Sequence, residues 1–390
     1  MDRTYRVALV ASHVIQYQDP FFRLLASAPD IDLTVLFCSS AGAQPYLDAD
    51  MQTTLRWDLE MLQGYRHRFL HNFGSGEGYA RLINPGIVPA LLFGRYDAVI
   101  FFLGWGTISS LLGIAACRAG GTPVLIFGDS SHPPAETSAS RQLRAGAMRT
   151  LFGMADGFLI SGLLNAEYYR HYGADPSRFF DVPWAIDNQR FVNASRFAPR
   201  ERDAMRARLG FRPDQTVFVF SAKFIPRKDP LTLLRALDRM RQRDRGAVLF
   251  LGHGELRDEM ERYVREQGLT AHFAGFVNQT DLPKYYAAGD AFVLASTYEP
   301  RGTVVNEAMA CGLPLIVTDV YGAIGDIASE GENTLIFKPG DVEALAAHLD
   351  RLVENPELRA RMAQRSREII DGWNYERGVA GVREALRSIC

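Results

Sequence analysis

Cysteine and lysine are both scarce in this sequence, and the two charge signs nearly cancel. The four cysteines, Cys38, Cys117, Cys311 and Cys390, show no paired spacing. They therefore suggest neither a disulfide framework nor a zinc cluster, and they indicate a reducing compartment. The formal net charge is only −2, which gives no overall attraction to nucleic acid or to acidic lipid. We expect no nucleic-acid partner.

The sequence also lacks a visible signal peptide and an unbroken apolar span. The first six residues lead directly into an apolar run, so we expect a cytoplasmic protein. Residues 98–117 carry no charge and approach the length of a membrane-spanning helix, but Gly104-Trp105-Gly106-Thr107 interrupts them. We interpret this stretch as a buried strand over 98–103 followed by a buried helix over 108–119.

What is present is an alternation of apolar runs and helical segments. The 390 residues are 47% hydrophobic, enough for two domains. Runs typical of buried strands, such as Val7–Ala11 and Val124–Phe127, alternate with helical stretches, and the pattern restarts after a polar region near 187–198. The sequence therefore predicts an α/β fold with two doubly wound, Rossmann-like domains and a cleft between the carboxyl ends of their strands.

The most informative stretch is Tyr298 to Cys311, which follows the apolar run 291–295. It predicts a strand, a tight loop and a helix that begins near Thr303. Glu299 lies in the loop and Glu307 lies about one turn inside the helix, while Gly302 lets the backbone approach a ligand closely. The free N–H groups at the helix start form an anion site. A sugar joined to a diphosphate would suit this arrangement of carboxylates and amides.

A second stretch points to the same chemistry. Lysine occurs at only four positions, and two of them, Lys223 and Lys228, fall in one short loop after a strand. A lysine ammonium is a compact charge suited to phosphate oxygens. An ordinary solvated loop is the alternative, and the neighbouring glutamate block favours phosphate contact. Gly252-His253-Gly254 also follows a strand and opens a helix.

Together these blocks resemble the nucleotide-sugar domain of retaining glycosyltransferases of family 4, which have the GT-B architecture. The matching blocks occur in the family's order: Ala222 to Lys228, Gly252 to Arg257, Phe273 to Val277, and Glu299 with Glu307-Ala308-Met309-Ala310-Cys311-Gly312. The resemblance implies an N-terminal acceptor-binding domain over 1–190 and a C-terminal donor-binding domain over 198–372. It also implies that a final helix over 373–390 packs back onto the first domain.

The resemblance also implies roles for individual residues. Lys223 and Lys228 would neutralise the donor diphosphate, Glu299 would contact sugar hydroxyls, and Glu307 would accept from ribose hydroxyls. The remaining donor contacts are expected from Gly254, Val277, Pro300, Arg301, Gly302, Thr303 and Val304. Transfer would retain the anomeric configuration and need neither metal nor cofactor, with a UDP- or GDP-sugar as co-substrate.

Some positions depart from the family pattern. Lys223 stands where the family commonly has arginine, and Arg301 replaces a common phenylalanine. The first loop, residues 12–18, lacks the usual Gly-Gly. Acceptor-side candidates are His132, which we count among the catalytic candidates, with His13 and Asp129. A structural or surface role stays equally open for each lone histidine.

Asp48-Ala49-Asp50 mimics the metal-binding Asp-x-Asp of another glycosyltransferase class. Because no strongly hydrophobic strand precedes it, we interpret it as a loop and expect no metal site.

The sequence thus predicts a retaining, metal-independent glycosyltransferase of surface polysaccharide, glycolipid or other glycoconjugate biosynthesis in bacteria. Its partners would be a nucleotide-sugar donor and a glycan, glycolipid or small-molecule acceptor. Two alternatives stay open: a GT-B sugar-nucleotide epimerase, which the paired glutamates disfavour, and a non-catalytic nucleotide-sugar-binding protein, which Lys223 and Arg301 motivate. Peripheral contact with the inner membrane also stays open, although no basic amphipathic anchor is visible.

Overall fold

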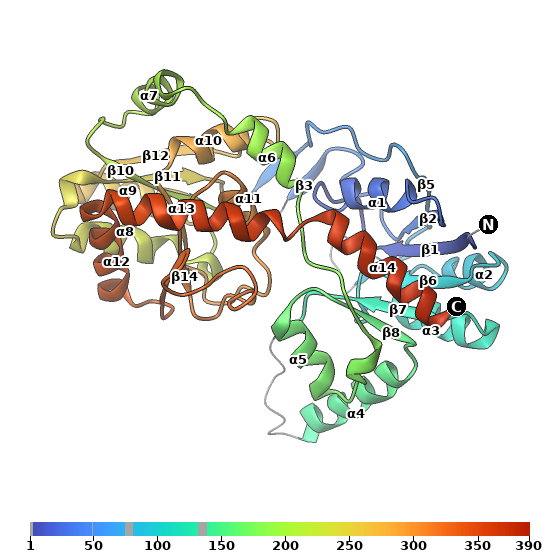
Figure 1. Cartoon of the computed structure of the whole chain (residues 1–390). Coiled ribbons are helices and arrows are strands. Elements are labelled where there is room, and N and C mark those ends of the chain that lie inside the picture. Colours follow the sequence, from blue (N-terminus) through green and yellow to red (C-terminus); the bar gives the residue numbers. More distant parts are fainter. Residues whose placement is uncertain (1–2, 49, 75–80, 132–138) are drawn as a thin grey trace. The chain divides into compact units, whose positions relative to one another are not determined.

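The computed structural model describes residues 3–48, 50–74, 81–131 and 139–390, which form two compact α/β units (Figure 1). The first unit comprises Met1–Pro45, Glu60–Ala185 and Asn374–Cys390, and the second comprises Tyr46–Leu59 and Ile186–Trp373. The chain therefore starts in the first unit and enters the second over Tyr46–Leu59. It then returns to the first unit, crosses to the second again over Ile186–Trp373, and ends in the first.

The first unit is built on a parallel sheet with the strand order β5-β2-β1-β6-β7-β8-β9. Val7 pairs with Leu33 on one side and with Ala98 on the other. Strands β6, β7 and β8 are buried along their whole length, as expected for strands covered on both faces. The strand bounds are Tyr5–Ala11 (β1), Ile31–Phe37 (β2), Arg66–Phe69 (β5), Ala98–Phe101 (β6), Val124–Phe127 (β7), Gly157–Ile160 (β8) and Phe179–Asp181 (β9).

The uncharged stretch 98–117 forms a strand and a helix inside this unit, as the sequence predicted. It supplies β6 and most of α3, Ile108–Gly120. Thr107 caps α3 by accepting a hydrogen bond from the amide of Ser110, and the helix ends at Gly121 with φ of 69°. Within the described parts of the chain, no helix combines the length and apolar character that a bilayer crossing needs.

The other helices of the first unit surround its sheet (Figure 1). They are Asp19–Ala26 (α1), Ile87–Leu92 (α2), Ala139–Gly153 (α4), Leu163–His171 (α5) and Tyr375–Ile389 (α14). Helix α14 lies against β9 and α1. It approaches the strand closely at Gly381, where a Cβ atom would lie 1.9 Å from the carbonyl oxygen of Asp181. The carboxyl-terminal helix is therefore part of the first unit.

The second unit has a parallel sheet with the strand order β12-β11-β10-β13-β14-β15. Numbered within the unit, this is the order 3-2-1-4-5-6 of nucleotide-binding doubly wound sheets. The direction of winding reverses between β10 and β13, where such sheets place their ligands at the carboxyl ends of the strands. The strand bounds are Thr216–Ser221 (β10), Gly246–Leu251 (β11), Ala271–Gly275 (β12), Ala291–Leu294 (β13), Leu315–Thr318 (β14) and Thr334–Phe337 (β15).

Helices cover the second sheet. Their bounds are Asn188–Ala194 (α6), Pro199–Arg208 (α7), Pro230–Arg239 (α8), Arg257–Gln267 (α9), Leu282–Ala288 (α10), Thr303–Ala310 (α11), Val342–Glu354 (α12) and Pro356–Asp371 (α13). Helix α6 lies in the polar region near 187–198 where the alternating pattern pauses. Asp187 caps it by accepting a hydrogen bond from the amide of Arg190 at 3.1 Å, and Phe191 buries its side chain completely.

A small antiparallel hairpin of the second unit comes from an unexpected part of the sequence. Its strands are β3, Tyr46–Asp48, and β4, Thr53–Leu55. These residues lie in the chain between β2 and β5 of the first unit, and the sequence division placed them in a domain over 1–190. The structure assigns them to the second unit instead. It also corrects the loop expected at 48–50, because Asp48 ends β3 and Asp50 lies in the hairpin turn.

Candidate functional site

The candidate site lies at the carboxyl edge of the second sheet. Four loops leave the strands at this edge: residues 222–229 after β10, 252–256 after β11, 276–281 after β12, and 295–302 after β13. Because parallel strands end at one edge, these loops lie together. They carry most of the residues that the sequence singled out.

An ion pair between Lys228 and Glu299 joins the loops after β10 and β13. The ammonium of Lys228 contacts Oε2 of Glu299, and their side chains are only 13% and 6% exposed. Ser296 Oγ donates a second hydrogen bond to the same carboxylate oxygen at 3.1 Å. Burial lowers the pKa of Lys228, and the charge of Glu299 opposes that effect. The expected phosphate-binding lysine and sugar-binding carboxylate thus stand in one buried pair.

The helix α11 begins beside this pair, at Thr303, as the sequence predicted. The residue before it, Gly302, has φ of 52°, and a Cβ atom there would lie 3.0 Å from Cγ of Glu299. Glycine therefore lets the helix start approach the carboxylate. It also has no side chain to cap the first turn, whose amides, including those of Thr303 and Val304, lie at the same edge. Pro300 lies within the connecting loop.

Glu307 is a buried carboxylate inside α11. Its side chain accepts a hydrogen bond of 2.9 Å from the hydroxyl of Tyr286 on α10. Burial raises the pKa of Glu307 from 4.5 to about 7, against smaller lowering effects from Tyr286, Arg190 and Gln279. The carboxyl group is therefore held in place and poised to change charge near neutral pH.

Arg301 occupies a buried position rather than an open one. It is 5% exposed, and its guanidinium Nη1 lies 3.9 Å from Oδ2 of Asp326, which is equally buried. Burial raises the pKa of the Tyr321 hydroxyl, and the positive charge of Arg301 opposes that rise. A carboxylate thus offsets the cation that the sequence placed near the donor.

The loops after β10 and β11 bind each other through their backbones. The amide of Phe224 donates to the carbonyl of His253 at 2.9 Å, and the amide of Leu256 donates to the carbonyl of Phe224 at 3.0 Å. Gly254 has φ of 156°, and a Cβ atom there would lie 2.6 Å from the carbonyl oxygen of Phe224. This contact explains the glycine by packing alone. Half-buried Val277 lies in the next loop, after β12.

Lys223 does not join the Lys228 pair. Its ammonium contacts two hairpin carboxylates, Oδ1 of Asp48 at 3.0 Å and Oδ2 of Asp50 at 2.9 Å. Among the described residues, no group of three or more histidine, cysteine or acidic side chains is placed to hold a metal ion. Here the Asp-x-Asp sequence faces a lysine.

Four residues of this edge were not predicted as site residues: Asp48, Asp50, Tyr286 and Asp326. The Asp-x-Asp spacing was the signal for the first two, but nothing in it indicated a lysine 175 positions away. Tyr286 stands in a short helix with no neighbouring motif, and Asp326 lies in a loop beyond β14. Their roles depend on contacts that only the folded unit creates.

The acceptor-side candidates belong to the first unit. His13 follows β1, and its Nδ1 lies 3.0 Å from Oγ of Ser12. Burial lowers its pKa, so the ring is neutral at physiological pH. Asp129 is exposed after β7, at the same edge of the sheet as His13. His132 lies outside the described residues.

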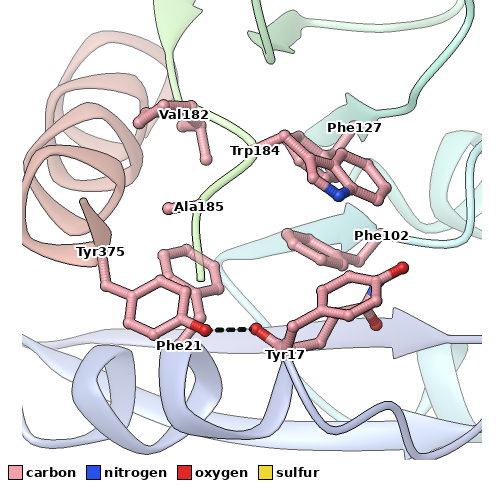
Figure 2. Close-up of a pocket in the computed structure, with 10 residues that line it drawn as sticks. Tyr17, Phe21, Phe102, Phe127, Val182, Trp184, Ala185 and Tyr375 are labelled. Atoms are coloured by element: carbon pink, nitrogen blue, oxygen red, sulfur yellow. Dashed lines mark hydrogen bonds between the residues drawn. The ribbon is translucent and has the colours of Figure 1, made fainter. Parts of the chain in front are cut away.

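An aromatic pocket lies at this edge of the first unit (Figure 2). Phe127 stacks between Phe102, at 4.2 Å, and Trp184, at 5.2 Å. Tyr375 of α14 closes one side by donating its hydroxyl to the carbonyl of Tyr17. The cavity volume is about 20 Å³, which holds about one water molecule. This cluster therefore acts mainly as packing between α14 and the sheet.

Comparisons with known proteins agree with the geometry of the second unit. Residues 201–369 match the family described as "Glycosyl transferases group 1". This part of the chain is therefore similar to group 1 glycosyl transferases. It contains the loops after β10 to β13 and the whole of α11, so the site described above lies inside the matched region except for Asp48 and Asp50 of the hairpin.

Related sequences carry glycosyltransferase names. The chain is 30% identical over 273 residues to "D-inositol 3-phosphate glycosyltransferase" of Rhodococcus opacus, covering 67% of this chain and 58% of that protein. It is 34% identical over 170 residues to "Lipopolysaccharide core biosynthesis glycosyltransferase LpsE" of Rhizobium meliloti, covering 43% of this chain and 48% of that protein. The chain thus spans less than two thirds of the length of these relatives.

Solved structures confirm the predicted α/β fold of GT-B type. Anabaena HepE in complex with UDP matches with a TM-score of 0.74 at 16% identity, covering 98% of this chain and 100% of that one. HepE in complex with UDP-glucose matches with a TM-score of 0.71 at 17% identity and the same coverage. At these identities the likeness concerns the fold.

Proposed function

We propose that the protein is a glycosyltransferase that moves a sugar from a nucleotide-activated donor to a hydroxyl-bearing acceptor. One observation carries the proposal: the buried Lys228–Glu299 pair stands at the start of α11, one turn before buried Glu307, in the region that matches the group 1 glycosyl transferases. This edge holds a cation, helix amides and two carboxylates, which are the groups that a diphosphate joined to a sugar needs.

Different residues of the site would bind different parts of the donor. Lys228 and the amides of Thr303 and Val304 would neutralise the diphosphate as it leaves, because charge develops there in the transition state. When Lys228 turns to the phosphate, the carboxylate of Glu299 becomes available to accept from sugar hydroxyls. Glu307 would accept from the ribose once its proton is lost. None of these three roles needs a metal ion.

The donor would be a UDP- or GDP-sugar. Two of the similar structures are of Anabaena HepE with UDP and with UDP-glucose, and these names support testing uridine nucleotides first. The proposed transfer retains configuration by attack on one face of the sugar. The bond from the anomeric carbon to the phosphate oxygen breaks, the acceptor oxygen bonds to the same face, and the departing phosphate oxygen takes the acceptor's proton.

The acceptor would be a glycan, a glycolipid or a small polar molecule with a free hydroxyl. The names of the Rhodococcus and Rhizobium relatives support an inositol phosphate or a lipopolysaccharide core sugar as first choices. A growing surface polysaccharide or glycolipid would place the protein on the cytoplasmic side of the inner membrane, in peripheral contact with it. His13, Asp129 and His132 are the residues to test on the acceptor side.

Thermal unfolding with UDP, GDP, ADP, TDP and CDP, each with and without magnesium, tests the donor site. A diphosphate at about a hundred times its dissociation constant stabilises the folded protein by about 2.7 kcal/mol. We expect one base to stand out without metal, and the shift to vanish in Lys228→Met and Glu307→Ala. Lys284→Met is the matched control, because Lys284 faces a surface hollow with Glu201 and Arg208. Loss of the shift in that control would contradict the assignment.

Turnover then separates a transferase from a binding protein. Sugars of the selected base are incubated with inositol phosphates and with lipopolysaccharide core acceptors, and release of the diphosphate is followed. A product whose anomeric configuration matches the donor by NMR supports retention, whereas inversion contradicts it. Binding with no turnover for any acceptor would favour a nucleotide-sugar-binding protein.

A further inference from the structure

The hairpin Tyr46–Leu59 lies on three of the four loops of the candidate site. Its carboxylates Asp48 and Asp50 hold the ammonium of Lys223, in the loop after β10. The carbonyl of Met51, next in the turn, accepts a hydrogen bond of 3.0 Å from Nδ1 of His253, in the loop after β11. One turn of the hairpin therefore engages both loops that the sequence assigned to phosphate binding.

The residues that follow β4 reach the loop after β12. Asn278 Nδ2 donates to the carbonyl of Arg56 at 2.6 Å, and the amide of Thr280 donates to Oδ2 of Asp58 at 3.1 Å. The ring of Trp57 meets that of Phe276 edge to face, with centroids 6.0 Å apart. This loop also carries Val277, one of the residues expected to contact the donor.

The contacts of the fourth loop are of a different kind. Glu299 is held by Lys228 and Ser296, and Glu307 is held by Tyr286, all from the main body of the second unit. The hairpin thus engages Lys223 and the loops after β11 and β12, while Lys228, the two carboxylates and the start of α11 are held by other partners.

We propose that the hairpin Tyr46–Leu59 is a built-in competitor of the donor, in which Asp48 and Asp50 occupy the diphosphate's place at Lys223. The inference rests on the proposed function, since it needs a diphosphate at this edge. Two carboxylates present about the same charge to the ammonium as a diphosphate does. Asp48 and Asp50 remain paired with Lys223 until the donor displaces them, so the charge of Lys223 is neutralised when no donor is bound.

The charges and exposures suit a displaceable contact. The side chain of Lys223 is 33% exposed and that of Asp50 is 57% exposed, whereas that of Asp48 is 13% exposed, so the contact with Asp50 is the weaker of the two. By contrast, the Lys228–Glu299 pair is buried on both sides. If only a fraction of the protein molecules is able to bind a ligand, the apparent affinity of the protein for that ligand is reduced by that fraction. Removing the competitor should therefore tighten donor binding.

The test measures the dissociation constant of the best nucleoside diphosphate by calorimetry in wild type and in Asp48→Asn/Asp50→Asn. Asparagine keeps the side-chain oxygen that accepts from the amide of Met51 at 2.9 Å, so the turn is preserved. We expect about fivefold tighter binding, which equals about 1 kcal/mol. Asp50→Asn alone alters only an exposed side chain, and it should show part of the gain even if the double variant folds poorly.

A matched control separates the contact from overall charge. Asp214→Asn/Glu266→Gln also removes two negative charges from the second unit, at positions that precede β10 and β12 and so lie toward the opposite edge of the sheet. Both side chains are exposed. The control should change the affinity by less than twofold. An equal gain in both double variants would overturn the proposal by showing that general repulsion is responsible.

The other outcomes are equally clear. Equal affinity in wild type and Asp48→Asn/Asp50→Asn would refute the proposal that the hairpin competes with the donor, but it would not contradict the assignment of the donor site. Weaker binding in the variant would also refute that proposal, and magnesium-dependent binding lost in the variant would show that the carboxylates recruit a metal to the diphosphate. If neither protein binds any diphosphate, the proposed function fails and the competitor fails with it.

Discussion

Glu307→Gln should remove a pH dependence of stability that the wild type carries. Burial raises the pKa of Glu307 to about 7, against 4.5 for an exposed glutamate. Between these values the folded protein binds more protons than the unfolded chain, so the free energy of unfolding falls as the pH rises. The stabilisation is complete below the unfolded pKa and is lost as the pH passes through the folded one.

The magnitude follows from the two pKa values. Each tenfold change in the proton equilibrium is worth about 1.4 kcal/mol, so raising the pH from 5 to 8 should cost the wild type about 2.5 kcal/mol through this group. Glutamine has no proton to lose, and its side-chain oxygen can still accept from Tyr286, which lies 2.9 Å from the carboxylate. The variant should therefore lose much less stability over that range.

Urea unfolding of both proteins at pH 5, 6, 7 and 8 measures the difference. Subtracting the two curves cancels the other titrating groups, because both proteins share them. The wild type should fall below the variant by a margin that grows with pH and levels off above pH 8. A margin that stays constant over the whole range would refute the burial argument for Glu307.

Three further predictions concern the same unit. Lys228→Met should lower the free energy of unfolding by about 3 kcal/mol, because it leaves the carboxylate of Glu299 buried without its ammonium partner. The double variant Lys228→Met/Glu299→Gln should recover most of that loss. Equal urea midpoints for the single and double variants would contradict this prediction. Tyr286→Phe removes a hydrogen bond that favours ionised Glu307, so the fall in stability should move to higher pH, and an unchanged pH midpoint would count against the contact. Gly254→Ala should cost about 2 kcal/mol in thermal unfolding, since its methyl group would lie 2.6 Å from a backbone carbonyl oxygen; a loss below about 0.5 kcal/mol would show that the turn relaxes.

The parallel strands were the most readable part of the sequence. Val124–Phe127 and Ala291–Leu294 are fully buried, and strands covered on both faces appear as continuous apolar runs. The α11 start was equally readable, because Gly302 and the apolar residues after Thr303 mark it. Local composition decides such elements, so they can be recognised without knowledge of the fold.

The hairpin could not be predicted in the same way. Tyr46–Asp48 and Thr53–Leu55 are each three residues long and partly exposed, so they present no buried run. Their place in the second unit depends on partners far away in sequence, such as Lys223 for Asp48. Local patterns carry no information about such pairings, and the Asp-x-Asp stretch was interpreted as a loop.

The candidate site was readable in part for the same reason. Motif spacing brought Lys228, Glu299 and Glu307 to one edge of one sheet. It did not show that Lys228 and Glu299 would contact each other directly, or that Tyr286 would fix Glu307. Spacing along the chain predicts which edge a residue occupies, whereas side-chain pairing also depends on burial and on neighbouring loops.

Hydrogen exchange of the second unit, with and without the best nucleoside diphosphate, tests the proposed donor site most directly. The account predicts slower amide exchange in residues 252–257 after β11 and in residues 299–307 at the start of α11. It also predicts that this protection is absent in Lys228→Met at the same ligand concentration. Protection confined to the first unit, or none at a saturating concentration, would contradict the assignment of the donor site to this edge.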